Sequence, residues 1–305
     1  MARISLRKQG NRPLRALTVS CGGGGRNIAN ALKGDMISVD TSAEADLRMD
    51  AAAISVSDMD SQFTRYVTSP FTEGLKKAMI GHDAVFAVAG LGGLAGGVAV
   101  ETVAKLAAVN SLPCIASVAL PFNVEGSLRR TEARKALNRI GGSASITIPF
   151  ENNMIVESVP SFNIMRALAV MNRIIASPLL DIGDAGDALW SKALIGRHFM
   201  GTYTVGYSAG KDWEERVVSE ILSNIFEHHQ GPGNMCLFVR TSSDSEESCR
   251  KIAEEIERRS DVDEITVYGM SDAHPDQNRV SAIYLYAGAA KKSHYQAVDI
   301  VPDGT

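Results

Sequence analysis

Two glycine-rich runs constrain the fold of this chain more than any other feature of its sequence. The first covers residues 22–25 and follows the apolar run "RALTVS"; the second covers residues 90–97, "GLGGLAGG", and follows "DAVFAV". Each run leads into a segment with helical spacing, and the order strand, glycine loop, helix aims backbone N–H groups at a phosphate. Glycine at such a turn also satisfies a positive φ or a close helix–strand contact, so one run alone is weak evidence. Two runs in one chain favour two loops that meet at one polyphosphate.

The composition is that of a globular protein with a sizeable core. The chain has 305 residues, of which 45% are hydrophobic and 22% charged, enough for two domains of ordinary size. The net charge of −4 implies no general attraction to nucleic acid. The four cysteines are scattered without a CxxC pair, which argues against a zinc site or a disulfide framework and predicts a reducing, cytoplasmic location. We expect neither a membrane span nor a signal peptide, because no apolar stretch is long enough.

Short apolar runs alternate with helical patterns along the chain, which predicts an α/β fold with a parallel sheet. The expected strands of the first half are Ala16–Ser20, Met36–Asp40, Ala52–Val56, Ala84–Val88, Cys114–Ala119 and Ala144–Ile148. The expected helices there are Asn27–Lys33, Thr72–Ile80, Val98–Val109 and Leu128–Ile140. In the second half we expect helices at Trp213–His228 and Ser243–Ser260, and strands at Met235–Arg240, Glu264–Tyr268 and Arg279–Gly288.

Between the two halves lies a long segment that is apolar on more than one side and is bracketed by Pro160 and Pro178. A helix that is buried on several faces belongs between two domains. A Gly-rich acidic loop, "DIGDAGDALW", follows it. The expected organisation is a nucleotide-binding domain at 15–158, a central helix at 159–180, a second domain at 181–290 and a short tail at 291–305.

Residues 1–14 form a basic segment in front of the first domain. Within the first fifteen residues there is no acidic residue, and the basic ones are Arg3, Arg7, Lys8, Arg12 and Arg15. We expect a solvated, flexible leader, because chain ends with little apolar surface to bury are seldom ordered. The alternative is a weak contact of this terminus with a membrane, an adaptor or a neighbouring subunit.

The order of these features resembles the tubulin/FtsZ family, from about Arg15 to Ala290. The matching segments are "CGGGGRN", "AGLGGLAGG", "PFNVEGSLRR", "DIGDAGDALWSKALIGRHFMG" and, as one match, "GPGNMCLFVRTSSD" with "NRVSAIYLYAGA". They stand in the family's order and at its separations. The resemblance implies a Rossmann-like parallel sheet that binds GTP, a long central helix and a second, smaller α/β domain.

The resemblance also implies a guanine nucleotide, GTP or GDP, at the carboxyl ends of the parallel strands, with Mg²⁺ expected beside GTP. The residues that match the family's nucleotide contacts are Gly22, Gly23, Gly24, Gly25, Asn27, Gly90, Gly92, Gly93, Leu94, Ala95, Gly96, Glu125 and Arg129. On the central helix, Phe162 and Asn163 are the candidates for stacking on the base and bonding to it. A phenylalanine at this position fits the core equally well.

Members of the family stack head to tail, so that the acidic loop of one subunit reaches the nucleotide of the next. Asp184 and Asp187 match the acids of that loop. Two carboxylates three residues apart at a helix start can point into one site, where they would polarise water and hold a cation at the γ-phosphate. Without the resemblance, helix capping explains the same pair. The resemblance therefore implies a homopolymer with any GTP hydrolysis at the subunit interface.

The chain departs from the family's pattern in several places. Leu94 and Ala95 stand where the signature loop has Gly and Thr, and the missing hydroxyl costs about 1 kcal/mol of phosphate binding. A short acidic segment at 55–62, "SVSDMDSQ", replaces the loop that wraps the γ-phosphate. Phe150 stands in the place of the ribose-side Asn, with Asn152 close enough to substitute for it. These departures predict slow hydrolysis.

Three functions stay open on the sequence alone. The first is an FtsZ-like GTP-binding filament protein that acts in cell division or membrane remodelling. The second is a scaffold filament that nucleotide stabilises without significant GTPase activity. The third is an NAD-binding Rossmann oxidoreductase in which Asp40, at the end of its strand, bonds a ribose.

Overall fold

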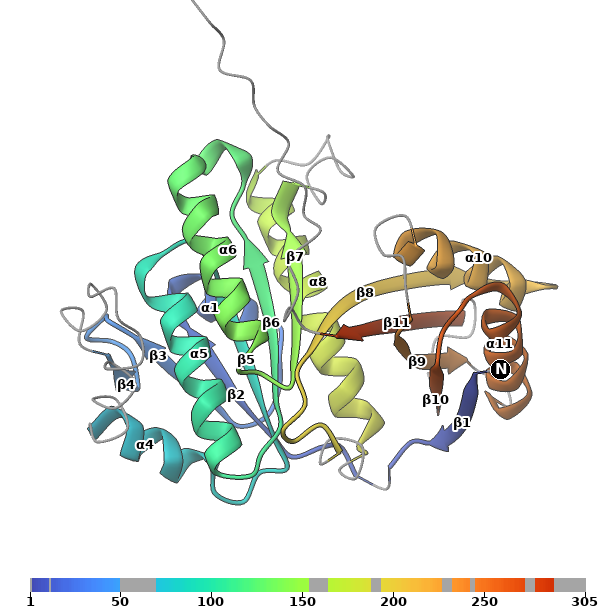
Figure 1. Ribbon diagram of the computed structural model, residues 1–305, viewed down its shortest axis with the longest axis horizontal. Helices are drawn as coiled ribbons and strands as arrows, with labels where there is room; N and C mark the ends of the chain where they lie inside the picture. Colours follow the sequence, from blue (N-terminus) through green and yellow to red (C-terminus); the bar gives the residue numbers. More distant parts are fainter. Residues whose placement is uncertain are drawn as a thin grey trace, which may run out of the picture.

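The computed structural model describes residues 2–10, 12–49, 70–153, 164–187, 193–226, 232–241, 245–271 and 278–287. Its strands are β1 (Arg3–Lys8), β2 (Ala16–Cys21), β3 (Met36–Asp40), β4 (Leu47–Arg48), β5 (Ala84–Gly90), β6 (Cys114–Leu120), β7 (Ile146–Glu151), β8 (Phe199–Ser208), β9 (Asn234–Thr241), β10 (Glu264–Ser271) and β11 (Asn278–Ala287). Its helices are α1 (Gly22–Ala29), α4 (Pro70–Met79), α5 (Leu94–Val109), the short η1 (Asn123–Glu125), α6 (Ser127–Gly141), α8 (Ile164–Ala185), α10 (Trp213–Phe226) and α11 (Ser245–Arg259). The strands form one sheet in the order β1-β10-β9-β11-β8-β7-β6-β5-β2-β3-β4 (Figure 1).

The first half of the sheet, β2 to β7, is parallel, which confirms the predicted α/β class. Helices α1 and α8 pack on one face, and α4, α5 and α6 pack on the other (Figure 1). Because both faces are covered, β5 and β6 are apolar and buried along nearly their whole length. All carboxyl ends of parallel strands lie at one edge of the sheet, so the glycine runs after β2 and β5 emerge at the same edge.

The sheet continues into the second half through a short parallel contact between β7 and β8, where Ile146 pairs with Phe199. Strand β11 lies antiparallel between β8 and β9. Helices α10 and α11 pack on the face of these strands that is opposite to α8. The predicted central helix is confirmed as α8, which lies between the two halves of the sheet (Figure 1). Its buried residues Met171 and Ile175 share one core with Phe238 and Ile283 of the second half.

The predicted strands and helices that fall within the described residues are all found, most with ends shifted by a few positions. The expected strand Ala52–Val56 lies outside the described residues. Strand β8 was not predicted, because its glycines weaken the strand pattern. Gly206 stands there because a Cβ would lie 2.6 Å from the side chain of Val217 on α10. Of the helices in the described ranges, none has the length and apolar character needed to cross a bilayer.

Residues 3–8 form an ordered strand, so the expectation of a flexible leader at 1–14 is wrong for this part of it. β1 pairs in parallel with β10 from Arg3–Glu264 to Lys8–Gly269 and thereby extends the second half of the sheet at its edge (Figure 1). Ile4 packs against the core beneath α10 and α11. Residues 3–8 form a strand because the edge of β10 offers backbone hydrogen-bond partners. The basic sequence of this segment gives no sign of that pairing.

Helix α8 continues through Pro178 and ends at Ala185, five residues beyond the predicted end at residue 180. Proline removes one N–H donor from a helix and disturbs the carbonyls one turn before it. Two serine hydroxyls donate to carbonyls in this region: Ser117 of β6 to that of Ile175 at 2.6 Å, and Ser177 to that of Arg173 at 2.8 Å. The carbonyl that loses its donor to Pro178 is that of Ile174, and these two bonds supply donors to the carbonyls on either side of it. Residues 181–185, expected in an acidic loop, form the last turn of α8.

The contact between Ser117 and α8 generates a stability prediction. Ser117 is fully buried. We expect Ser117→Ala to lower the free energy of unfolding by about 1–3 kcal/mol, because a buried carbonyl loses its donor. Ser177→Ala is the matched control, since it removes a solvent-exposed hydroxyl bond from the same helix; its expected effect is about 0.5 kcal/mol. Urea denaturation measures both, and equal losses would contradict the role of Ser117.

Candidate functional site

Helices α1 and α5 begin side by side at the carboxyl edge of the sheet. A Cβ placed on Gly24 would lie 3.0 Å from the backbone N of Gly90, and one placed on Gly22 would lie 3.3 Å from that of Gly96. The structure therefore brings the two glycine runs into contact, although about seventy residues separate them in the chain.

The glycines of these runs fall into two groups. Gly25 and Gly96 are required by packing, because a Cβ would lie 2.3 Å from the carbonyl oxygen of Val88 at the first position and 2.7 Å from a β5 carbonyl oxygen at the second. Gly23 and Gly93 are different: both are exposed, and a Cβ on either would meet no atom within 4 Å. Packing therefore explains some of the glycines but not Gly23 and Gly93, where the backbone is accessible from outside.

The glycine run 22–25 is itself the first turn of α1, where we expected a loop before a helix that starts at Asn27. The N-cap residues of α1 and α5, Cys21 and Gly93, make no side-chain capping bond within the described residues, and neither first turn contains an acidic residue. The first-turn N–H groups, which have no partner within their own helix, and two positive helix-dipole ends therefore face the same edge, which is an arrangement suited to phosphate. Asn27 is exposed on α1, and Ala95 is half-buried at the start of α5.

Of the predicted ribose-side residues, Glu125 ends η1 and Arg129 lies in the first turn of α6, beside the second run. A Cβ on Gly92 would lie 2.9 Å from the carbonyl oxygen of Arg129. Glu125 accepts a bond from the guanidinium of Arg129 at 2.7 Å and another from the N–H of Phe122 at 2.8 Å. The side chain of Arg129 is 60% exposed, so it can leave this pair for a ligand at little cost.

Asn152 follows β7 at the same edge and has an unusual environment. It is 9% exposed, and its Oδ1 has no hydrogen-bond partner in the part of the chain that is described. A buried acceptor without a donor costs about 1–3 kcal/mol, which a ligand that donates a hydrogen bond would recover. Phe150, by contrast, packs against the ring of Tyr203 with centroids 6.4 Å apart. Phe162, Asn163 and the acidic segment 55–62 lie outside the described residues.

Asp184 lies in the last turn of α8, so the expectation of a helix start is wrong for this residue. Asp187 lies two residues after the end of α8, and the segment that follows it, 188–192, lies outside the described residues. Asp184 accepts from Nη2 of Arg240 at 2.8 Å. Asp187, just after the helix, accepts from Nη1 of Arg7 at 2.5 Å and from the hydroxyl of Tyr268 at 2.9 Å. The dipole at a helix C-terminus disfavours carboxylates, so N-terminal capping does not explain Asp184. We call residues 184–187 the acidic turn.

The acidic turn lies at the amino edge of the first-half strands, opposite the glycine runs. The N–H of Leu14, just before β2, donates to the carbonyl of Gly183 at 2.8 Å. Strand β2 then leads from Ala16 to Cys21, directly into the first glycine run, and a strand of this length spans about 17 Å. The acidic turn therefore does not contact the glycine runs of its own chain.

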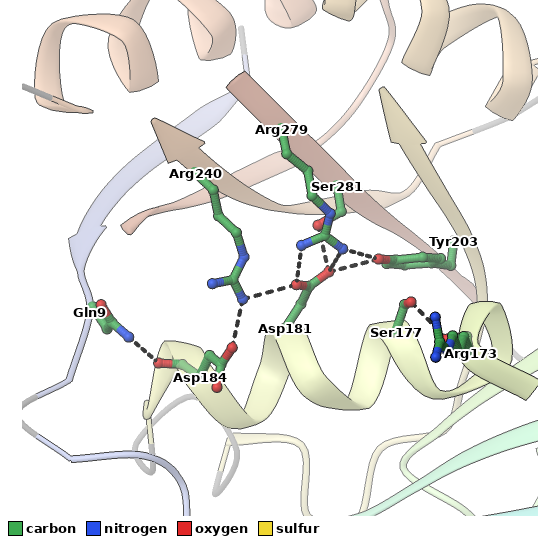
Figure 2. A network of polar contacts seen from close by, with 9 residues as sticks. All are labelled: Gln9, Arg173, Ser177, Asp181, Asp184, Tyr203, Arg240, Arg279 and Ser281. Atoms are coloured by element: carbon green, nitrogen blue, oxygen red, sulfur yellow. Dashed lines mark hydrogen bonds and ion pairs between the residues drawn. The ribbon is translucent and has the colours of Figure 1, made fainter. Parts of the chain in front are cut away.

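Asp181 is the centre of a buried polar network within reach of the acidic turn (Figure 2). Its side chain is 1% exposed. It accepts hydrogen bonds from Arg279 at 2.8 Å, Arg240 at 3.1 Å, Tyr203 at 2.7 Å and Ser281 at 2.6 Å. These donors come from β8, β9 and β11, so one carboxylate ties α8 to three strands of the second half.

The protonation states in this network follow from burial and charge. Burial alone would lower the pKa of Arg279, but the Asp181 carboxylate raises it above its ordinary value. Arg240 responds in the same way, to Asp181 and Asp184 together. Burial and the Asp181 charge raise the pKa of Tyr203, which stays a neutral donor. None of these residues was predicted from the sequence; the available signal was a charged residue inside the mainly apolar runs "CLFVRT" and "NRVSAIY".

This network generates a second stability prediction. We expect Asp181→Ala to lower the free energy of unfolding by about 3–5 kcal/mol, because it leaves the guanidinium groups of Arg279 and Arg240 without their buried counter-charge. The control is Glu44→Ala, which breaks an ion pair with Arg26 in which Glu44 is 81% exposed; we expect a change of about 0.5 kcal/mol or less. Thermal and urea unfolding measure both. A similar loss in the two variants would show that the network does not depend on its buried carboxylate.

Comparison with known sequences finds relatives that are proteins of cell division. No family model matches the chain. Cell division protein FtsZ 1 of Archaeoglobus fulgidus is 26% identical over 228 residues, which cover 70% of this chain and 61% of that protein. Cell division protein FtsZ 2 of Halobacterium salinarum is 27% identical over 186 residues, or 56% of this chain and 47% of that protein. The chain thus spans about half to three fifths of the length of these relatives.

Comparison with solved structures covers nearly the whole chain. An FtsZ mutant from M. jannaschii has a TM-score of 0.73 at 21% identity and covers 90% of this chain and 92% of its own. CetZ1 from Haloferax volcanii, a GDP-bound monomer, has a TM-score of 0.71 at 11% identity and covers 91% of this chain and 95% of its own. At these identities the likeness is one of fold. With the sequence relatives and the motifs in their family order, it leads to one conclusion: this chain is a divergent member of the tubulin/FtsZ superfamily.

Proposed function

We propose that this protein binds a guanine nucleotide and assembles head to tail into filaments, with the nucleotide between successive subunits. The observation that carries the proposal is the position of the glycine runs and the acidic turn at opposite edges of one sheet. Contact between unlike surfaces continues as an open chain instead of closing as a dimer. CetZ2 of H. volcanii and TubZ of Bacillus thuringiensis both occur as GTPγS-form protofilaments, which supports the same arrangement here.

The phosphates would lie against the N-termini of α1 and α5, where Gly23 and Gly93 leave the backbone accessible. Arg129 and the buried acceptor of Asn152 would lie on the ribose side. Phe162 and Asn163 stay predictions for the base. No group of three or more metal-ligating side chains occurs among the described residues. Mg²⁺ bound with GTP would therefore be held largely by phosphate oxygens and water.

Hydrolysis would need the acids of the next subunit to orient a water at the γ-phosphate. Asp184 and Asp187 each have an arginine partner, which reduces the negative charge that they present. Ala95 also lacks the hydroxyl that the family places near the phosphate. We therefore propose slow hydrolysis at the subunit interface. The same arginine pairs favour the second candidate, a nucleotide-stabilised scaffold filament with little catalysis.

The cellular role that fits best is cell division or membrane remodelling in the cytoplasm, since the named relatives are cell division proteins. Contact with a membrane or an adaptor through the termini stays a prediction. The NAD alternative has less support. Asp40 stands at the end of β3, where a ribose-binding acid would be, but its Oδ1 already accepts the N–H of Thr41 at 2.7 Å.

The first functional prediction concerns nucleotide identity. We expect the protein to bind GTP and GDP at least about tenfold more tightly than ATP or NAD, a difference of about 1.4 kcal/mol. Gly23→Ala is expected to reduce this affinity about tenfold or more, because its methyl group occupies the open space that faces the phosphates. Titration with fluorescent nucleotides measures the affinities, and chromatography identifies any nucleotide released from the purified protein.

A control separates ligand contact from packing in this experiment. Gly23→Ala should leave the stability of the apo protein unchanged or slightly raised, since alanine favours a helix by up to about 1 kcal/mol. Gly96→Ala should lower stability as well as affinity, because its Cβ would lie 2.7 Å from a β5 carbonyl oxygen. Equal or absent binding of GTP and ATP contradicts the proposal, and released NAD supports the oxidoreductase.

The second functional prediction concerns the shared site. We expect filaments in electron micrographs and in pelleting assays, and GTP turnover per molecule that rises with protein concentration, because each site needs two subunits. Asp187→Ala should remove the turnover and leave GTP binding within about twofold of wild type, since the acidic turn is remote from the glycine runs of its own chain. Turnover that is independent of concentration and survives loss of both aspartates contradicts this mechanism. Filaments without turnover favour the scaffold.

A further inference from the structure

We propose that the N-terminal residues 3–10 and 12–14, which we call the clamp, are part of the subunit face that carries the acidic turn, and that Arg7 positions Asp187 for contact with the next subunit. This inference rests on the proposed head-to-tail contact and adds a component to it. The clamp lies outside the motifs that resemble the tubulin/FtsZ family, since these begin at about Arg15.

The clamp donates hydrogen bonds to the C-terminal end of α8. The last carbonyls of a helix have no donor within the helix itself. Three carbonyls at the end of α8, those of Gly183, Asp184 and Ala185, accept hydrogen bonds from Leu14, Gln9 and Gly10 at 2.8, 2.9 and 2.8 Å, respectively. The bond from Gln9 is visible in Figure 2. The clamp thus caps the central helix and fixes the position from which the acidic turn starts.

Close backbone contacts hold the clamp against the acidic turn. A Cβ on Gly10 would lie 2.5 Å from the carbonyl oxygen of Gly186. Gly186 has a φ of +65°, and a Cβ there would lie 2.2 Å from the carbonyl oxygen of Arg12. Side chains larger than hydrogen do not fit at either position, so the two segments meet through their main chains.

Arg7 and Tyr268 hold the carboxylate of Asp187 from adjacent strands. In the parallel pairing of β1 with β10, Arg7 lies opposite Tyr268, and both donate to Oδ2 of Asp187. Asp187 is 14% exposed, and Arg7 is 39% exposed. Partial burial alone would lower the pKa of Arg7, but its hydrogen bond to Asp187 and the charges around it together raise the pKa above its ordinary value. The carboxylate is oriented within the face, and part of the guanidinium stays at the surface.

This arrangement matters because the opposing surface would carry a polyphosphate. Bare carboxylates repel phosphate, by about 1 kcal/mol per pair of charges at 4 Å in water and by more in a drier contact. Arg7 and Arg240 offset the charges of Asp187 and Asp184 on this face. The clamp therefore lets the acidic turn approach a nucleotide, and it gives the basic N-terminus a specific role.

The test compares Arg7→Gln with Arg3→Gln. Arg3 is exposed on the same strand, about 13 Å away, so its replacement removes the same charge without touching Asp187. We expect Arg7→Gln to raise the critical concentration for pelleting with GTP about tenfold or more, and Arg3→Gln to change it less than about twofold. Arg7→Lys should restore part of the loss. GTP affinity, measured below the critical concentration, should stay within about twofold of wild type in all variants, because the clamp is remote from the glycine runs.

Hydrogen exchange of the unassembled protein gives a readout that does not depend on filaments. In Arg7→Gln we expect peptides covering residues 180–187 to exchange about tenfold faster or more, and peptides covering α10 to be unchanged. If wild type neither binds GTP nor pellets, the proposed function fails, and exchange still decides whether Arg7 orders the turn. If wild type pellets and Arg7→Gln pellets like Arg3→Gln, the role of Arg7 in the contact is overturned, whatever the exchange result.

Discussion

The buried carboxylate of Asp181 joins the central helix to the second half of the sheet, and the geometry of the acidic turn depends on it. A carboxylate that is 1% exposed needs several donors, and here they come from β8, β9 and β11. Each donor has a fixed place on its strand. Rotation of α8 about its axis would therefore separate charges in a dry environment, which is costly. Asp181 thus sets the side of α8 that faces the second half.

Arg240 also fixes the next turn of the helix, because its guanidinium contacts both Asp181 and Asp184 (Figure 2). The clamp acts from the other side, where it caps the last carbonyls of α8 and pairs Arg7 with Asp187. The acidic turn is therefore held at both ends by cations from the second half of the sheet. A face of this kind differs from a cluster of free carboxylates, since it can approach phosphate without an excess of negative charge.

The glycine runs show that packing and ligand access can shape one short sequence together. Gly25 and Gly96 allow α1, α5 and β5 to approach closely, whereas Gly23 and Gly93 leave the backbone open. The sequence pattern identifies the runs but does not separate these two roles, because the role of each glycine depends on what lies opposite it in space. Asn152 illustrates the same limit: its buried oxygen, which has no hydrogen-bond partner among the described residues, can be identified only once its neighbours are known.

The sequence by itself determined the α/β class, most of the strands and helices, the central helix and the superfamily. These follow from local patterns, namely apolar runs, helical spacing, glycine between them and the order of the motifs. Tertiary structure decided where α8 ends, what holds the two aspartates and what the N-terminus does. Helix α8 continues through Pro178, and Ser117, on a distant strand, donates to the carbonyl of Ile175 in the turn before the proline. Arg7 became part of the acidic face because a strand edge formed by β10 orders it, beside an aspartate 180 residues away. Such contacts join residues that are remote in the chain, so no local pattern carries them, and only folding brings their charges and hydrogen bonds together.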